Sequence, residues 1–269
     1  MTREPIFNVP SVIVALILGL AALHGLREYW LDDSQDAQLL LSLAFVPGRF
    51  TYAFDPAGVA DVFASFQGPL GRAQEETARF LLGDGQPLWW TTVSYALLHA
   101  DWMHLGVNCL WLAAFGAPVA RRFGTWRFLA LMGLGSLGGA ALHYATHRYD
   151  LMPVIGASAS VSAAIGAAVR FVFQPGAPLG GIAGDSFHQP AQSLRHVFTS
   201  SRTLPFLLIW FAVNLVFGLI SAPLGITDGP VAWEAHVGGF AAGLLLFPLL
   251  DPAISTLHPS SWDQHDEVA

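Results

Sequence analysis

The sequence alternates long apolar stretches with polar connections, and the apolar stretches have the length that crosses a lipid bilayer. A helix needs about 20 mostly apolar residues to span a hydrocarbon core about 30 Å thick. Six stretches meet this criterion, at about residues 9–26, 90–114, 123–144, 157–173, 204–220 and 233–250. The pattern therefore predicts an all-α membrane bundle of six transmembrane helices.

The connections between these stretches predict one membrane domain over residues 1–269. The first stretch is followed by Arg27-Glu28 rather than by a small-residue cleavage pattern, so we expect it to be a retained helix and not a signal peptide. The long segment 27–88 carries nine acidic residues and four arginines. It predicts short helical pieces, near residues 39–45 and 75–82, but no span. The chain ends in a short polar tail, 251–269.

Composition limits the function classes. The chain is 54% hydrophobic and 12% charged, against about 25% charged residues in an ordinary soluble domain. This excludes a water-soluble monomer and predicts contact with a lipid bilayer. A net charge of −7 argues against a nucleic-acid partner, which requires a basic surface. The single cysteine, Cys109, excludes a disulfide framework and a multi-cysteine metal site.

The positions of arginine predict the orientation of the bundle, because loops that face the cytoplasm carry the basic excess. The predicted connections after the second and fourth spans contain Arg121, Arg122, Arg127, Arg170, Arg195 and Arg202. We therefore expect both termini in the cytoplasm, the 27–88 segment outside, and a multi-pass protein of the cell (inner) membrane.

Polar side chains inside predicted spans are costly in lipid, so each is a candidate for function. In the second span, His104 and Asn108 are four residues apart, on one helical face and about 6 Å apart along the axis. His99 lies five residues earlier, on another face. The alternative role for this pair is an inter-helix hydrogen bond, worth about 0.6 kcal/mol on average.

The fourth span begins with Gly156-Ala157-Ser158. With about 17 residues this span is short, so its first turn is expected below the outer membrane surface, where a serine is wet yet inside the membrane. The helix N-terminus also supplies unpaired backbone N–H groups and a positive dipole end, which suit a developing oxyanion. The alternative is that small serines simply pack.

The sixth span begins with Ala235-His236, and Gly239 and Gly243 follow on the same face. Small residues at four-residue spacing let helices approach closely in lipid. If the fourth and sixth spans pack in this way, the imidazole of His236 comes within reach of Ser158. A serine beside a base is the arrangement of covalent catalysis.

Together the strings H-x4-H-L-x2-N, G-x-S and A-H-x2-G-x3-G resemble the rhomboid family of intramembrane serine proteases, in their order and in their assignment to the second, fourth and sixth helices. The resemblance implies that Ser158 is the nucleophile and His236 the general base. It implies an oxyanion hole formed by His104, Asn108 and the Ser158 backbone N–H, with His99 as a supporting residue.

The resemblance covers about residues 89–250 and has three departures. Ala159 stands where the family usually has glycine after the serine, and Ser162 stands where several members have an aromatic residue that stacks on the histidine. The 27–88 segment lacks the Trp-Arg pair seen in many members. Ser160 and Ser162 are rival nucleophiles, and Gly156, Gly239 and Gly243 are expected to support the site.

The implied function is hydrolysis of peptide bonds in or near transmembrane segments of other membrane proteins, with no cofactor and no metal. One alternative is a catalytically inactive relative that binds or escorts membrane proteins. A metalloprotease would use His143 and His147, but the glutamate of H-E-x-x-H and a third ligand are missing from the sequence around them. A transporter is disfavoured because the spans contain almost no acidic residues. The sequence does not fix an oligomeric state.

Overall fold

The computed structural model describes residues 9–174, 190–220 and 231–252, and the tail predicted at 251–269 lies almost wholly outside them. In this part of the chain all regular elements are helical, and a single pair of residues, Phe45 and Val154, forms an isolated antiparallel bridge. The helices are α1 (Ser11–Tyr29), α2 (Asp33–Leu43), α3 (Pro47–Tyr52), α4 (Pro56–Ser65), α5 (Gly68–Leu82), α6 (Thr91–Ser94), η1 (Tyr95–Leu97), α7 (Trp102–Trp111), η2 (Leu112–Gly116), α8 (Ala117–Phe123), α9 (Thr125–His147), α10 (Ser158–Ala168), α11 (Leu194–Thr199), α12 (Thr203–Ile220) and α13 (Trp233–Leu250). The predicted all-α fold is confirmed.

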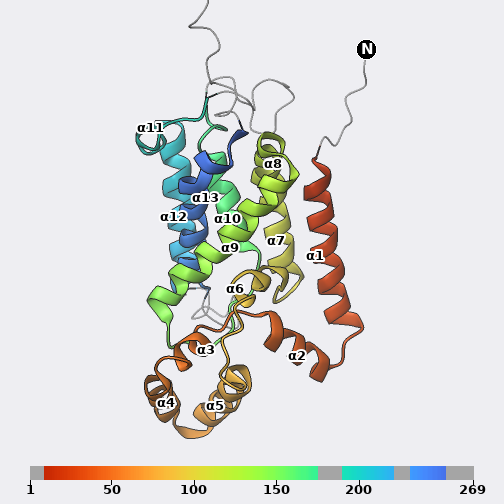
Figure 1. The fold of residues 1–269 in the computed structure, drawn as a ribbon, viewed down its shortest axis with the longest axis vertical. Helices are drawn as coiled ribbons and strands as arrows, with labels where there is room; N and C mark the ends of the chain where they lie inside the picture. Colours follow the sequence, from red (N-terminus) through yellow and green to blue (C-terminus); the bar gives the residue numbers. More distant parts are fainter. Residues whose placement is uncertain (1–8, 175–189, 221–230, 253–269) are drawn as a thin grey trace, which may run out of the picture.

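The long helices form an upright bundle (Figure 1). Five of them are long and apolar enough to cross a membrane: α1, the continuous run α7–η2–α8, α9, α12 and α13. The remaining predicted span, the fourth, is the shorter apolar helix α10, with 11 residues or about 17 Å of rise. Every residue of α10 from Ala159 to Ala168 is buried, so this helix lies inside the bundle and contacts protein on all sides.

Two predicted spans have different limits in the structure. The second was expected at residues 90–114, but the long helix begins at Trp102 and continues to Phe123. It begins there because the side chain of Asp101 caps it, accepting a hydrogen bond of 2.7 Å from the His104 backbone N–H. Within this run, the π-helical turns η2 directly precede Pro118, which has no N–H for the regular ladder.

The fourth span was expected to continue to residue 173, but helix α10 ends at Ala168. Beyond it, Arg170 is buried, and its guanidinium donates to the backbone oxygens of Gln192 and Leu244. Arg122 is also buried, in a two-bond ion pair with Asp251 at 2.7 and 2.9 Å. The expectation that these two arginines are loop charges was wrong, because both pack inside the protein.

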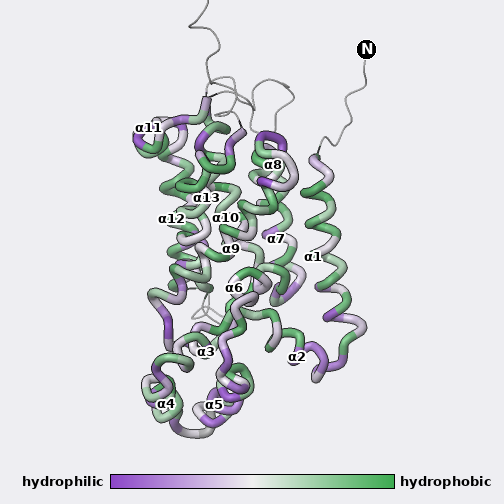
Figure 2. The backbone as a smooth tube through the Cα atoms, viewed as in Figure 1, coloured by the Kyte–Doolittle hydropathy of each residue, from purple (hydrophilic) through white to green (hydrophobic). Residues whose placement is uncertain are grey.

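The 27–88 segment forms helices α2–α5, which lie beneath one end of the bundle (Figure 1). None of these helices is a candidate span, and hydrophilic residues concentrate on α2 and α5 (Figure 2). The prediction of helical pieces without a span is confirmed. Arg49 joins three of the helices, because it donates to the backbone oxygens of Leu41 and Leu81 at 2.7 and 2.6 Å.

Helices α9, α10 and α13 pack closely through small residues. A Cβ atom added at Gly243 would overlap the backbone of Ala163, and one added at Gly239 would overlap the backbone of Ala159. On the α9 side, a Cβ at Gly138 would lie 2.9 Å from the Gly238 backbone oxygen. This is the small-residue packing that brings helix backbones together in lipid.

Candidate active site

The turn before α10 is held by η1 and by the segment between η1 and α7. Gly156 has a φ of 118°, a conformation that favours glycine. Its N–H donates to the backbone oxygen of Tyr95 at 3.0 Å, and the Ala157 N–H donates to Nε2 of His99 at 3.3 Å. His99 is fully buried and stands in the irregular segment before α7, not in the second span as expected. The backbone entering Ser158 is therefore fixed by two hydrogen bonds.

Ser158 is the first residue of α10 and is half-buried, with His104 across the Gly156 turn. A Cβ built at Gly156 would lie 3.7 Å from the Ser158 Oγ and 2.7 Å from the His104 Nε2. The serine hydroxyl and the imidazole therefore flank the same glycine. A side chain at residue 156 would fill the space between them.

The ring of His104 is oriented by the turn that precedes α7. Its Nδ1 accepts a hydrogen bond of 3.4 Å from the Ala100 backbone N–H. In a neutral imidazole the other nitrogen then carries the proton, so Nε2 is a donor. The His104 ring also packs edge-on against His99, with 5.0 Å between centroids. This arrangement presents an N–H donor toward Gly156.

Asn108 is buried one turn further along α7. One of its side-chain N–H groups donates to the backbone oxygen of His104 at 2.9 Å. The amide thus lies on the same helical face as His104, as the four-residue spacing predicted. Its second N–H is not used by this bond.

His236 lies in the first turn of α13, and the structure adds a partner that the sequence did not indicate. Its Nδ1 lies 2.5 Å from the Oδ1 of Asn214 on α12. The amide of Asn214 is itself oriented, because its Nδ2 donates to the backbone oxygen of Trp210 at 2.7 Å. Oδ1 can only accept, so the Nδ1 of His236 donates and its Nε2 is left as an acceptor. An unprotonated Nε2 is what a general base requires.

The helices that carry the nucleophile and base candidates touch at the residue after the serine, since Gly239 of α13 meets the backbone of Ala159. His104 of α7 lies beside Gly156, two residues before Ser158 of α10. The structure thus brings α7, α10 and α13 to one place. Among the described residues, however, no hydrogen bond joins the Ser158 hydroxyl to His236.

The rival serines are buried in α10. Ser160 lies 2.5 Å from the hydroxyl of Ser136 and donates to the backbone oxygen of Met132 at 2.9 Å. Ser162 is 4% exposed. Within the described ring pairs none includes His236, and its imidazole instead bonds to Asn214.

Sequence reasoning missed Asn214, although a signal was present. Between Leu204 and Ile220, Asn214 is the one polar side chain of α12. A lone polar residue inside a span is a functional hypothesis by the same rule that singled out His104. It also missed Asp101 and Tyr95, which hold the backbone around the site.

Outside the bundle, the connection between α9 and α10, residues 148–157, is joined to the start of α4 through Tyr149. The carboxylate of Asp55 accepts hydrogen bonds from the Gly58 backbone N–H and from the hydroxyl of Tyr149, at 2.9 and 2.7 Å. These bonds hold the pKa of Asp55 below its usual 3.8. The Asp55 carboxylate is therefore charged and fixes the first turn of α4 against this connection.

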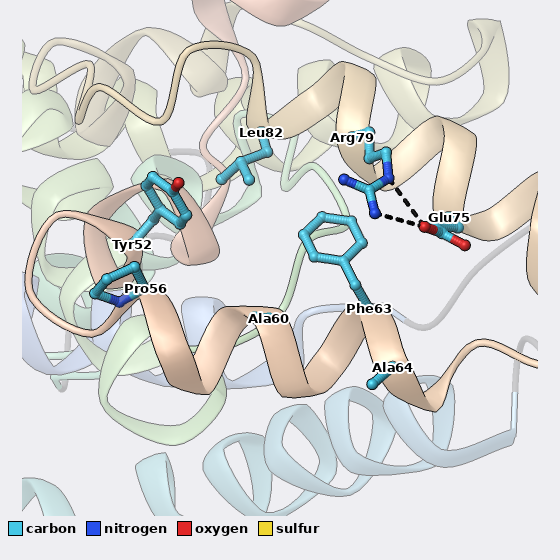
Figure 3. A pocket seen from close by; sticks show the side chains of 8 residues that line it. All are labelled: Tyr52, Pro56, Ala60, Phe63, Ala64, Glu75, Arg79 and Leu82. Carbon is cyan, nitrogen blue, oxygen red and sulfur yellow. Dashed lines mark hydrogen bonds and ion pairs between the residues drawn. The ribbon is translucent and has the colours of Figure 1, made fainter.

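An open pocket of about 440 Å³ lies between α4 and α5 (Figure 3). At its rim, Arg79 forms an ion pair with Glu75 and covers the ring of Phe63 at 4.6 Å. The pocket is lined by residues of α3, α4 and α5 only. It contributes nothing to the cluster around Ser158.

Comparison with known families gives one match: residues 86–252 match the Rhomboid domain. The match covers the bundle from the segment before α6 to the end of α13, and therefore every candidate site residue. A search of curated proteins finds no match.

Proposed function

Because the chain belongs to the rhomboid family, a family of integral multi-pass membrane proteins that act on other membrane proteins, we propose that it is an intramembrane serine protease. Its substrates are peptide bonds in or near the transmembrane segments of other membrane proteins. The observation that carries the proposal is the meeting of three helices at Gly156 and Ala159, with Ser158, His104 and His236 around them.

In this proposal Ser158 is the nucleophile and His236 the base. Nε2 of His236 takes the hydroxyl proton as Oγ attacks the scissile carbonyl, and returns it to the leaving amine when the C–N bond breaks. Water then attacks the resulting ester, losing a proton to Nε2, and restores the serine. The Nε2–H of His104, the free N–H of Asn108 and the Ser158 N–H stabilise the oxyanion.

Asn214 is the positioning residue of the mechanism. Aspartate has this role in the triad of other serine proteases, where it holds the Nδ1–H of the histidine and fixes the reactive tautomer. The Oδ1 of Asn214 accepts from the same nitrogen. An uncharged amide performs this task at membrane depth without the cost of a buried charge.

We infer a single membrane domain over residues 1–269, with both termini on the cytoplasmic side and the α2–α5 segment on the outer side. In this orientation the Ser158 end of α10 faces the outer side, from which water reaches the acyl-enzyme. Four arginines outside the packed interior support it: Arg121 on α8, Arg127 at the start of α9, Arg195 on α11 and Arg202 just before α12. Helices α8 and α11 lie at the end of the bundle opposite α2–α5 (Figure 1).

The test is cleavage of a model transmembrane substrate by the full-length protein in lipid vesicles, with labelling by a fluorophosphonate and mass mapping of the labelled serine. Ser158→Ala and His236→Ala are each expected to abolish cleavage and labelling, whereas Ser160→Ala keeps Ser158 labelled. Cleavage that persists in both dyad variants contradicts the proposal. A folded wild-type protein that is neither labelled nor active is instead an inactive relative that binds membrane proteins.

A further inference from the structure

A second polar cluster lies where α9 ends and α13 begins. His143 and His147 are one turn apart on α9, and Glu234 stands in the first turn of α13. One ligand atom from each of the three residues lies within 4.8 Å of the others. The Nδ1 atoms of His143 and His147 are 3.7 and 3.8 Å from the two carboxylate oxygens of Glu234.

The burial of this cluster is costly without a further partner. The His143 side chain is 6% exposed, and neither of its ring nitrogens has a hydrogen-bond partner. The Glu234 side chain is 12% exposed. Buried polar groups in native proteins are nearly always hydrogen-bonded, so a buried imidazole that contacts a carboxylate only at 3.7 Å, without a hydrogen bond, indicates a missing ligand between them.

The geometry suits a small divalent cation better than a direct hydrogen bond. Distances of 3.7 and 3.8 Å are too long for a hydrogen bond. Two ligand atoms at a tetrahedral zinc, with bonds of about 2.1 Å, lie about 3.4 Å apart. The two imidazole rings are stacked at 4.9 Å, so both present their edges to the same carboxylate.

We propose that His143, His147 and Glu234 bind one zinc-like divalent ion that joins the end of α9 to the start of α13. Two imidazoles and a carboxylate are donors that Zn²⁺ accepts, whereas Mg²⁺ and Ca²⁺ require more oxygen ligands. A fourth position remains for water. The sequence supplied only two ligands here, and the packing of α13 against α9 provides the third.

The surroundings of His147 leave a metal ion a route to the cluster and one competing hydrogen bond to replace. The His147 side chain is 45% exposed, which gives an ion a route to the site. The competing contact is from Thr146, whose hydroxyl lies 2.9 Å from the Nδ1 of His147. This hydroxyl is also bonded to the backbone of α9, so the histidine can exchange it for a metal at little cost.

The site is separate from the dyad, but Glu234 lies two residues before His236. Bound metal would fix the first turn of α13 and so raise the thermal stability of the bundle, because a ligand that binds only the folded state stabilises it. This inference does not depend on proteolytic activity and is testable in a Ser158→Ala background.

The experiment uses the full-length Ser158→Ala protein, purified in detergent with a histidine-free tag and stripped with a chelator. Co²⁺ titration should give a saturable visible band of a tetrahedral site, displaced by one equivalent of Zn²⁺ but not by Mg²⁺. His143→Leu, His147→Gln and Glu234→Gln should each weaken Co²⁺ binding at least about 100-fold, since each removes a ligand.

His196→Gln is the matched control, because His196 lies on α11, away from the cluster, and is exposed. Zn²⁺ should raise the melting temperature of the parent and of this control, but not of the ligand variants. His143→Leu places an apolar side chain at the buried position, so it is expected to fold. Absent saturable binding in the parent, or unchanged binding in folded ligand variants, overturns the proposal.

Discussion

The two sides of α13 are built differently. Toward α9 and α10, it makes contact through glycines, and Gly239 and Gly243 lie directly on the backbone of α10. Toward α12, the contact is made by side chains: the rings of Trp210 and Phe240 stack at 4.9 Å, and Asn214 bonds to His236. Much of α12 faces outward, since only 17% of the 18 residues from Thr203 to Ile220 are buried.

This difference separates two requirements of the proposed catalysis. The distance between the helices of Ser158 and His236 is fixed by backbone contact, which involves no side-chain rotamers. The orientation of the imidazole is fixed from α12 by a single amide. Changes on the glycine side should therefore affect stability and activity together, and changes on the α12 side should affect mainly turnover.

The largest effect is expected from Gly243→Ala. The new Cβ would overlap the backbone of Ala163, which cannot turn aside as a side chain can, so we expect a loss of about 3 kcal/mol or more in the free energy of unfolding. Gly133→Ala is the control, because a Cβ there meets nothing within 4 Å. It should be neutral or stabilising by up to about 1 kcal/mol. Equal stabilities of the two variants, measured by thermal unfolding in detergent, would break the comparison.

Asn214→Leu should reduce kcat about tenfold or more, equivalent to about 1.4 kcal/mol of transition-state stabilisation, with KM and stability little changed. The reason is that Nδ1 of His236 loses its acceptor. Asn214→Asp keeps an acceptor oxygen and should recover part of the activity. Leu215→Ala, at an exposed position of the same helix, serves as control. A full-rate leucine variant would remove Asn214 from the mechanism.

Trp210→Ala sharpens the comparison on the α12 side. Trp210 is 7% exposed and packs against Phe240 and Phe211, so the loss comprises the stacked pair and the packing around the cavity left behind, at least about 1 kcal/mol. Leu208→Ala, at a residue that is 61% exposed, should cost less. Unfolding in mixed micelles measures both. A cost as large as that of Gly243→Ala would mean that α12 is as firmly packed as α10.

The smallest effect on stability is expected away from both sides of α13, at Asp55 before α4. Its folded-state pKa is lowered, so its carboxylate stabilises α4 above about pH 4, and this contribution disappears as the pH falls below 3.8 through the folded value. Asp55→Asn should remove that pH dependence locally. Hydrogen exchange of the α4 amides, compared with those of α10, measures it. Loss of protection in α10 as well would show that the two regions are not independent.

Much of the bundle was predictable from the sequence, because spans are set by local apolar length. The prediction for the sixth span, 233–250, coincides with α13, and that for the fifth begins one residue after α12 does. The second span failed because its apolar run continues across Asp101, and hydropathy does not register that this residue caps a helix. The fourth was too long because residues 169–173 are apolar apart from Arg170, yet they lie beyond the end of the helix.

The candidate site was predictable to the extent that its residues share a short string. Gly156 and Ser158 are two residues apart in the chain, and helix periodicity places His236 and Gly239 on one face. Asn214 belongs to no string with His236, and the contact exists only because α12 packs beside α13. The cluster around Glu234 was missed for the same reason. Helix periodicity places Glu234 on a different face of α13 from His236, but only the packing of α9 against α13 shows that Glu234 faces His143.

The bridge between Phe45 and Val154 has a mechanical consequence. Both backbone hydrogen bonds of this pair are present, at 3.1 and 2.8 Å, and the Gly48 N–H adds a third to Asp150. Val154 is two residues from Gly156. A force on α2 or α3, such as the lateral pressure of a membrane surface, is therefore transmitted along a few covalent bonds to the turn that carries Ser158. The α2–α3 segment, outside the Rhomboid match, is thus joined by hydrogen bonds to the turn that carries the proposed nucleophile.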